Sequence, residues 1–314
     1  TVIVHEPYWN AMAKHADIVV PVATALERED IAFGAGDRWV SHCEPAADPP
    51  PGIRPDYEVF AAISALLGVA EEFTEGRDAA AWVRELYRRS IERCADLGVR
   101  LPPWQDFTSA GVVELPLDWD EPVAFSELRA DPAAHPLATP SGKVELYSAT
   151  IAGFGYDDCP GQATWLEPAE WLGAADRYRL HLLSPQPAGK LHSQLDHGPE
   201  SRRHKIHSRT AVEMNPRDAR ERQLTEGDVV EVYNDRGRCL AGVRLNPDLR
   251  AGVAQLPTGS WYDPLEPGRI GTLDKHGHAN LLTSDRPTSR LAQGPTAHTC
   301  LVEVRRWQGP VPEV

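Results

Sequence analysis

The chain has 314 residues, 41% of them hydrophobic, which is enough to bury a substantial core and to build about two domains. Its net charge of −14 and pI near 5.3 argue against a general nucleic-acid-binding protein, whose affinity comes from cationic contacts to phosphates. No apolar run approaches the ~20 residues that span a bilayer, and the five scattered cysteines contain no CxxC pair, so zinc ribbons, iron–sulfur sites and thioredoxin-type couples lack support.

The first 22 residues read as strand, helix and strand: TVIVHE, WNAMAKHA and ADIVVPV. Two near-continuous apolar strands around a short helix predict an α/β layer with a parallel sheet. The chain opens inside the first predicted strand without an initiator Met, which favours a processed product or a fragment. Glu6 follows that strand, where open α/β sheets bind ligands. The Glu6 carboxylate could accept hydrogen bonds from a sugar hydroxyl or from the N–H groups of a guanine. The alternative is a solvated carboxylate at the end of a strand.

A charged cluster, Glu27-Arg28-Glu29-Asp30, follows the second predicted strand. By itself it is interpreted as a group of surface ion pairs. The Pro-rich stretch 46–55 predicts an exposed turn or linker. Helical spacing then predicts a helix over 56–68 with Tyr57, Phe60, Ala61 and Ser64 on one face, and Gly68 suits its end. A second amphipathic helix is predicted over 78–97.

Residues 99–175 are rich in Pro, Trp and acidic side chains and give few regular elements. TPSGKVELYS at 139–148 predicts a turn that feeds a short strand. Its Gly-Lys pair lacks the full spacing of a phosphate loop.

From residue 176 the pattern changes to short β-rich runs, which include 228–235, 238–246, 252–257 and 300–307. Asn215 followed by Pro216 predicts the start of one helix among them. Many short strands with turn signals predict a compact β-barrel. The basic run at 201–209 is interpreted as a solvated edge or hairpin, given the acidic chain.

The loop at 183–198, LSPQPAGKLHSQLDHG, follows an alternating strand pattern at 178–183. Its polar side chains suit a large polar cofactor, or they belong to an ordinary surface loop. They are Gln186, Lys190, His192, Ser193 and Gln194. Two further polar clusters occupy 276–294 and 294–299.

Together these segments resemble the molybdopterin guanine dinucleotide-dependent oxidoreductases of the dimethyl sulfoxide reductase family. HADIVVPVATALERED is similar to that family's ADIVLP…ERxD element, and TPSGKVELYS to its TPSGKIE turn. QPAGKLHSQLD resembles the loop of the biotin sulfoxide, trimethylamine N-oxide and dimethyl sulfoxide reductase branch. EGDVVEVYNDRG, ANLLTSDRPTSRLAQG and TAHTCLVEV resemble its C-terminal barrel, and the motifs come in family order.

The resemblance implies an α/β fold class: a partial parallel-sheet α/β domain followed by a C-terminal double-psi-like β-barrel. Residues 1–115 would be the rear part of the α/β molybdopterin-dinucleotide-binding domain, 116–175 a loop-rich connection, and 176–314 the barrel. The implied cofactor is bis(molybdopterin guanine dinucleotide) molybdenum. Glu6, Arg28 and Asp30 would contact its guanine nucleotide; Gln186, Lys190, His192, Ser193 and Gln194 its dithiolene and pyrophosphate region; and Asn280, Ser289, Gln293 and His298 its pterins.

Three positions depart from the family pattern. Lys190 stands where many members carry Arg, so the charge is kept but the planar two-pronged donor is lost. Glu6 replaces a more usual Asp. Ser184-Pro185-Gln186 resembles the biotin sulfoxide reductase pattern more than the His-Pro of other branches.

The implied function is the C-terminal cofactor-binding portion of an oxidoreductase that reduces an S-oxide or N-oxide by oxygen-atom transfer. The metal ligand would lie in the missing N-terminal half, so these residues include no expected catalytic or metal-binding residue. A small-molecule oxide and an electron donor would be the other partners, with nucleic acid and a membrane span excluded. The compartment stays open between cytoplasm and periplasm or export.

Two alternatives remain from the sequence. One keeps the cofactor but makes the reaction a dehydrogenation, as in formate dehydrogenase. The other is a non-catalytic binding subunit from a truncated gene. Because the first sheet reads as incomplete, we expect the isolated chain to be poorly soluble or partly disordered near Thr1.

Overall fold

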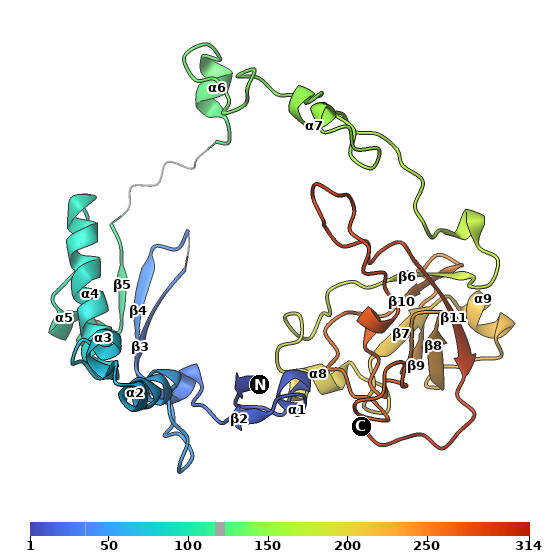
Figure 1. Cartoon of the computed structure of the whole chain (residues 1–314), viewed down its shortest axis with the longest axis horizontal. Coiled ribbons are helices and arrows are strands. Elements are labelled where there is room, and N and C mark those ends of the chain that lie inside the picture. Colours follow the sequence, from blue (N-terminus) through green and yellow to red (C-terminus); the bar gives the residue numbers. More distant parts are fainter. Residues whose placement is uncertain (35, 117–122) are drawn as a thin grey trace. The chain divides into compact units, whose positions relative to one another are not determined.

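A computed structural model describes residues 1–34, 36–116 and 123–314. The chain divides into two compact units, Thr1–His135 and Pro136–Val314, which are described separately below (Figure 1). The division into three segments that the sequence suggests, 1–115, 116–175 and 176–314, stays a prediction.

The first unit begins with the expected strand, helix and strand. β1 (Ile3–His5) pairs in parallel with β2 (Ile18–Val20), and α1 (Ala11–Lys14) connects them. The side chain of Asn10 accepts a hydrogen bond from the backbone N–H of Ala13 and so caps the start of α1. The predicted parallel pairing is confirmed.

A three-stranded antiparallel sheet follows, which the sequence analysis did not predict. It consists of β3 (Asp30–Phe33), β4 (Trp39–Cys43) and β5 (Val112–Glu114), with β4 in the centre. β3 and β4 follow the short 3₁₀ helix η1 (Ala25–Glu27). The amino-acid pattern did not indicate this sheet, because β5 comes about seventy residues after β4 in the chain. The pairing of these two strands therefore depends on tertiary contacts.

Helices cover this region of the first unit. Both long helices are confirmed: α2 (Asp56–Leu67) ends at Gly68 with φ +77°, and α4 (Ala79–Asp96) is capped by the side chain of Asp78. The expected face of α2 is partly wrong, since Val59 and Ser64 are buried whereas Phe60 is 46% exposed. The shorter helices are α3 (Ala70–Thr74), α5 (Trp104–Ala110) and α6 (Ser126–Ala130).

The second unit starts with an irregular stretch before the barrel. It contains α7 (Ala149–Gly153) and η2 (Leu172–Ala174). The turn predicted at 139–148 is present, but the strand predicted after it is wrong, because Tyr147 forms an isolated bridge with Gln162. Glu170 joins this stretch to the barrel through an ion pair with Arg236 and a 2.9 Å hydrogen bond from the N–H of Leu301.

The rest of the second unit is a closed barrel of six strands in the order β10-β6-β11-β8-β9-β7. The neighbours β6–β10 and β7–β9 are parallel, and the other four pairs are antiparallel. This confirms the predicted fold class. The strands are β6 (Leu180–Leu183), β7 (Ala211–Met214), β8 (Val229–Tyr233), β9 (Arg238–Leu245), β10 (Val253–Gln255) and β11 (Cys300–Arg306), with α8 (Pro199–Arg203), α9 (Pro216–Glu221) and η3 (Ala279–Leu281) between them.

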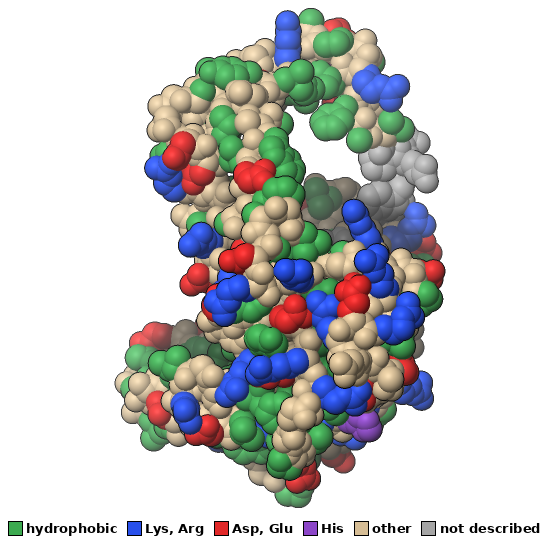
Figure 2. Space-filling view, turned by 90° about the vertical axis from the view of Figure 1, so that its right-hand side faces the viewer, with side chains coloured by type: hydrophobic (Ala, Val, Ile, Leu, Met, Phe, Trp, Pro, Cys, Tyr) green, Lys and Arg blue, Asp and Glu red, His purple; other side chains and the backbone are tan. Residues whose placement is uncertain are grey.

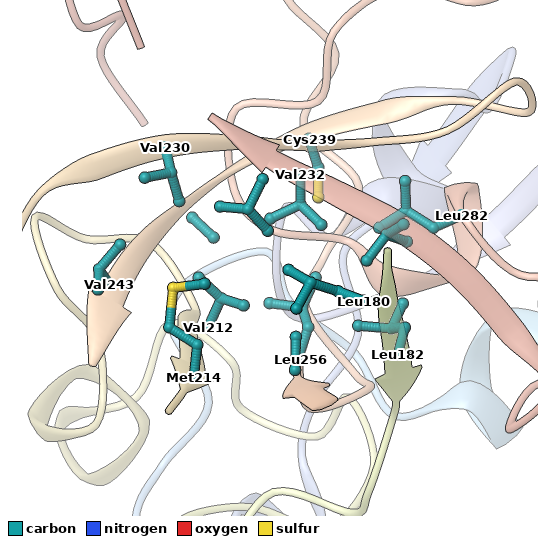
Figure 3. Packing of buried hydrophobic residues seen from close by; sticks show 14 of the residues in the cluster. Leu180, Leu182, Val212, Met214, Val230, Val232, Cys239, Val243, Leu256 and Leu282 are labelled. Atoms are coloured by element: carbon teal, nitrogen blue, oxygen red, sulfur yellow. The ribbon is translucent and has the colours of Figure 1, made fainter. Parts of the chain in front are cut away.

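Apolar side chains fill the barrel. Figure 3 shows Leu180 and Leu182 of β6 facing Leu256, Val232 and other inward residues, and all four are 0% exposed. Burying a leucine contributes about 1.5–3 kcal/mol. The barrel therefore has its own core, which provides a rigid base for the loops at its ends.

The surface carries both charge signs. On the face shown in Figure 2, Lys and Arg side chains are interspersed with Asp, Glu and apolar side chains. Among the described residues, no helix is long and apolar enough to cross a membrane.

Candidate functional site

The candidate site is built on two parallel neighbours of the barrel, β6 and β10. Parallel strands end at the same edge of a sheet, so the loops that follow them leave side by side. The N–H of Leu256 donates to the carbonyl of Leu183 at 3.0 Å, and that of Thr258 to the carbonyl of Pro185 at 3.0 Å. The strand pairing therefore continues into the loops 184–198 and 257–261.

Asp196 is the buried centre of these loops. Its carboxylate is 0% exposed and accepts hydrogen bonds from the ammonium of Lys190 and from the N–H of Trp261, at 2.9 Å to the latter. The ammonium of Lys205 lies 2.9 Å from the same carboxylate. Burial alone would raise the pKa of Asp196, but the charge that His276 carries when protonated, together with the hydrogen bonds from Lys190, Trp261 and Lys205, lowers this pKa to about 2. Asp196 is therefore a stable anion that holds two buried lysines.

His276 completes this cluster as a neutral ring. Its Nδ1 lies 3.0 Å from the carbonyl of Trp261, which accepts, and its Nε2 lies 2.7 Å from the ammonium of Lys205, which donates. We assign the Nδ1–H tautomer from these partners. Burial, aided by the charge of Lys205, lowers the pKa of His276. The neutral ring therefore adds no positive charge to the cluster of two lysines and one aspartate.

A second buried carboxylate, Asp274, shapes the next segment. It is 0% exposed and accepts from the backbone N–H groups of His276, Gly277 and His278 at 2.7–3.1 Å. The ring of His278 in turn lies 2.7 Å from the carbonyl of Ser260. The segment that leads to Asn280 in η3 is thus fixed to the loop after β10.

Exposed polar side chains extend from the loops that the buried residues Asp196 and Asp274 hold in place. The side chains of Gln186, His192, Gln194 and Asn280 are exposed and make no hydrogen bond to other described residues. Ser193, also exposed, accepts at its carbonyl from Nε1 of Trp261 at 2.8 Å. These side chains are available to a ligand, whereas the backbone that presents them is fixed.

Lys190 is largely buried, and its expected contact with the cofactor stays a prediction. Its side chain is 7% exposed, and its ammonium donates to Asp196 and, at 2.8 Å, to the carbonyl of Gly259. Two of its three N–H donors are therefore used inside the protein.

His298 lies beside the start of the same loop. Its Nδ1 faces the N–H of Ser184 at 3.5 Å, and its carbonyl lies 2.7 Å from Nε2 of His181. Of the expected pterin contacts, His298 and Asn280 therefore lie on segments linked to the β6 and β10 loops.

Ser289 and Gln293 lie on the long loop before β11, which projects from the barrel in Figure 1. Ser289 is buried and its Oγ accepts from the N–H of Ala292 at 3.0 Å, which is a local turn contact. Gln293 is exposed, with φ +52°, and donates to the carbonyl of Arg290 at 3.4 Å. Among the described residues, no hydrogen bond or ion pair joins these two to the loop 184–198.

The three expected nucleotide contacts lie in the first unit. Glu6 follows β1 and accepts from Nδ2 of Asn10 at 2.6 Å, which connects it to the cap of α1. Arg28 and Asp30 form an ion pair with each other at the start of β3. Within the described part of the chain, no hydrogen bond or ion pair joins Glu6 to this pair.

Comparison with known proteins decides the family. Residues 180–301 match the sequence model of the molydopterin dinucleotide binding domain, and residues 1–66 match that of molybdopterin oxidoreductase. The chain is 41% identical to a dimethyl sulfoxide/trimethylamine N-oxide reductase of Cereibacter sphaeroides, over 98% of this chain and 38% of the relative. The chain belongs to the molybdopterin oxidoreductase family.

Other relatives agree with this assignment. A biotin sulfoxide reductase of Cereibacter sphaeroides is 40% identical over 98% of this chain and 41% of its own length. Trimethylamine-N-oxide reductase 1 of Escherichia coli is 36% identical over 100% of this chain and 38% of its own length. The chain thus spans about two fifths of the curated relatives that it matches. The acetylene hydratase of Pelobacter acetylenicus shares the fold, with a TM-score of 0.68 at 20% identity over 97% of this chain and 40% of that one.

The residues present fit the dinucleotide cofactor of this family. A large polar ligand requires free donors and acceptors on a fixed backbone, which the exposed side chains around the Asp196 cluster provide. In addition, Ser184 is the first residue of the loop after β6, and its Oγ is buried without a hydrogen-bond partner among the described residues. A ligand oxygen or an ordered water would satisfy it.

Sequence reasoning missed the residues that hold the site in place. They are Asp196, Lys205, Trp261, Asp274 and His276. The one available signal was the Asp that closes the KLHSQLD run, six residues after Lys190. Its partners come from 205, 261 and 276, and the pattern of one sequence does not reveal contacts over such separations.

Proposed function

We propose that this chain is the C-terminal cofactor-binding portion of a molybdenum oxidoreductase that reduces an S-oxide or an N-oxide by oxygen-atom transfer. The observation that carries the proposal is the similarity, at 36–41% identity over nearly all of the chain, to relatives named for dimethyl sulfoxide, trimethylamine N-oxide and biotin sulfoxide reduction. The barrel with its polar loops is the part that would hold bis(molybdopterin guanine dinucleotide) molybdenum.

In this proposal the chain's residues bind and orient. Gln186, His192, Ser193 and Gln194 would contact the dithiolene and pyrophosphate region, while Lys190 holds their loop and offers its remaining N–H. Asn280 and His298 would contact the pterins, as would Ser289 and Gln293 on the neighbouring loop. Glu6, Arg28 and Asp30 would contact guanine.

When bound, the cofactor would supply the redox chemistry for oxygen-atom transfer, and the residues named above would bind and orient it. The residues proposed above make no covalent contact with the substrate. The metal ligand, the substrate pocket and the site of the electron donor would belong to the part of the protein outside this chain.

The test uses the full-length protein that contains this chain, produced in a host that makes the cofactor. We expect molybdenum with guanine nucleotide in the ratio of a bis(dinucleotide) cofactor, and reduction of dimethyl sulfoxide, trimethylamine N-oxide or biotin sulfoxide by reduced viologen. A folded protein without molybdenum and guanine nucleotide would overturn the cofactor assignment. A loaded protein that oxidises formate and reduces none of the oxides would favour a dehydrogenase.

A further inference from the structure

The turn between β8 and β9, residues 234–237, lies at the same end of the barrel as the loop after β6. β8 ends at Tyr233, which lies opposite Glu303 of β11. Cys300, at the start of β11, lies opposite Leu182, one residue before the end of β6. The turn, the start of β11 and the loop after β6 therefore meet at one barrel end.

The turn holds the end of η3, the short helix that carries Asn280. The carbonyl of Leu282 accepts from Nε of Arg236 at 2.7 Å and from Nδ2 of Asn234 at 2.8 Å. The side chain of Leu282 lies in the barrel core (Figure 3). Since Asp274 fixes the start of the same segment, Asn280 is held from both sides.

Gly237 shows how closely the turn approaches η3. A Cβ at this position would lie 2.7 Å from the carbonyl oxygen of Leu281 and 3.2 Å from its Cβ. Glycine allows two backbones to approach this closely. A larger residue at 237 would therefore push the turn away from η3.

Arg236 connects the same turn to two further segments. Its guanidinium forms a two-pronged ion pair with Glu170, and Glu170 accepts from the N–H of Leu301 at 2.9 Å. Nδ2 of Asn234 also donates to the carbonyl of Leu301 at 3.1 Å. The chain is therefore fixed three residues after His298, another of the expected pterin contacts.

The ion pair of Arg236 and Glu170 is partly buried and charged on both sides. Burial alone would raise the pKa of Glu170, but the hydrogen bonds from Arg236 and from the N–H of Leu301 lower it. Nε of Arg236 donates to Leu282 while its two terminal nitrogens donate to Glu170. One planar group thus holds two segments at a defined separation, which a lysine ammonium could not reproduce.

The loop that carries Ser289 and Gln293 borders the same ion pair. Glu170 and Arg236 line a cavity of about 930 Å³, and residues 284–288 of that loop form another part of its wall. The segments that carry all four expected pterin contacts are therefore adjacent to one arginine.

We propose that Arg236 is a positioning residue for the cofactor. By binding two segments at once, it fixes Asn280 and His298 relative to each other. Arg236 itself need not contact the cofactor. The inference rests on the proposed function, because it concerns the segments that are expected to contact the pterins.

The first test compares Arg236→Gln with Arg222→Gln in the full-length holoenzyme. Arg222 is a matched control in the same barrel: its guanidinium donates to Glu303 at 2.6 Å and to the carbonyl of Asp218 at 3.1 Å, and the pair is partly buried. Both changes should lower the free energy of unfolding in urea, because each removes one partner of such a pair. Only Arg236→Gln should speed the release of molybdenum and guanine nucleotide, by about tenfold.

A second test uses cofactor-free protein, from a host that cannot make molybdopterin, and measures amide hydrogen exchange. Exchange over residues 279–283 and 298–301 should rise about tenfold in Arg236→Gln relative to Arg222→Gln. Gly237→Ala should raise exchange over 279–283 in the same way. Gly153→Ala is its control, since a Cβ there meets no atom within 4 Å.

Arg236→Lys separates the geometry of the side chain from its charge. It keeps a positive charge opposite Glu170 and loses the planar donor, so we expect release of the cofactor close to that of Arg236→Gln. Wild-type retention of the cofactor in Arg236→Lys would overturn the proposal, as would equal release from Arg236→Gln and Arg222→Gln. A wild-type protein without molybdenum would instead overturn the proposed function, and the exchange comparison would then decide by itself whether Arg236 fixes these segments.

Discussion

At the residue scale, the polar residues of the candidate site form an exposed set and a buried set. Exposed side chains such as Gln186 and His192 are left free for a ligand, while buried groups such as Asp196 fix the backbone beneath them. Lys190 shows why residue type alone did not separate the two sets. A lysine in a polar loop suggested a ligand contact, and its burial against Asp196 became evident only in the fold.

Replacing Asp196 by Asn should strongly destabilise the barrel. The change leaves Lys190 and Lys205 buried without their counter-charge, and breaking such a pair costs about 3–5 kcal/mol. Thermal or urea unfolding of the protein measures the loss. Asp235→Asn is the control, since Asp235 and its partner Arg177 are both exposed and little change is expected. Equal stability of Asp196→Asn and the wild type would show that the cluster contributes little.

The same variant should reveal a pH dependence. The pKa of Asp196 is lowered to about 2 in the folded protein, below the ordinary value near 4 in the unfolded chain. The stabilisation by its charge is therefore complete above about pH 4 and is lost as the pH falls towards 2. We expect the difference in unfolding free energy between wild type and Asp196→Asn to shrink across this interval. A constant difference would contradict the assigned charge.

At the element scale, the strands and long helices follow from local pattern, and the loops depend on contacts between distant segments. Short β-rich runs predicted β8 and β9, amphipathic spacing predicted α4, and the Asn215-Pro216 cap predicted α9, because these signals lie within each element. The antiparallel sheet that includes β5 was missed because its pairing is long-range. The loop at 183–198 was recognised as polar, but its contacts with residues 257–261 could not be predicted for the same reason.

Gly259→Ala tests the contact between these two loops. Gly259 has φ +87°, and a Cβ there would lie 2.0 Å from the carbonyl oxygen of His192. Gly268→Ala is the matched control, with φ +82° and no atom within 4 Å of the added Cβ. We expect the control to lose about 1–2 kcal/mol from backbone strain, and Gly259→Ala to lose about 1–3 kcal/mol more from the clash. Unfolding measurements with molybdenum content check this, and equal losses would show that the loops do not depend on this approach.

At the scale of the whole molecule, the two units differ in how well they bury apolar surface. The barrel encloses a core of fully buried residues, including Leu180, Met214 and Leu240. The first unit has a small core around Tyr87 and Phe107. It leaves many apolar side chains exposed, among them Ile3 at 58% and Leu66 at 89%. Such exposure marks surface that is covered in an assembly or is prone to aggregation.

We therefore expect fragments of the two units to behave differently. A fragment of residues 136–314 should unfold cooperatively and bind little of a hydrophobic dye, because its core is its own. A fragment of residues 1–135 should bind the dye strongly or aggregate. Dye fluorescence and calorimetry compare them at equal concentration. A sharp, reversible transition of the 1–135 fragment without dye binding would contradict this expectation.

The parallel pair β6–β10 has a consequence for variation among related chains. Its register is three residues long, from Val253 opposite His181 to Gln255 opposite Leu183, and both site loops depart from it. Insertions or deletions farther out in either loop leave these starting points in place. A shift of one residue inside the pair would instead turn the apolar side chains outward and move both loops together. Insertions and deletions should therefore be tolerated in the loops beyond the paired residues of β6 and β10, and they should be selected against within that pairing.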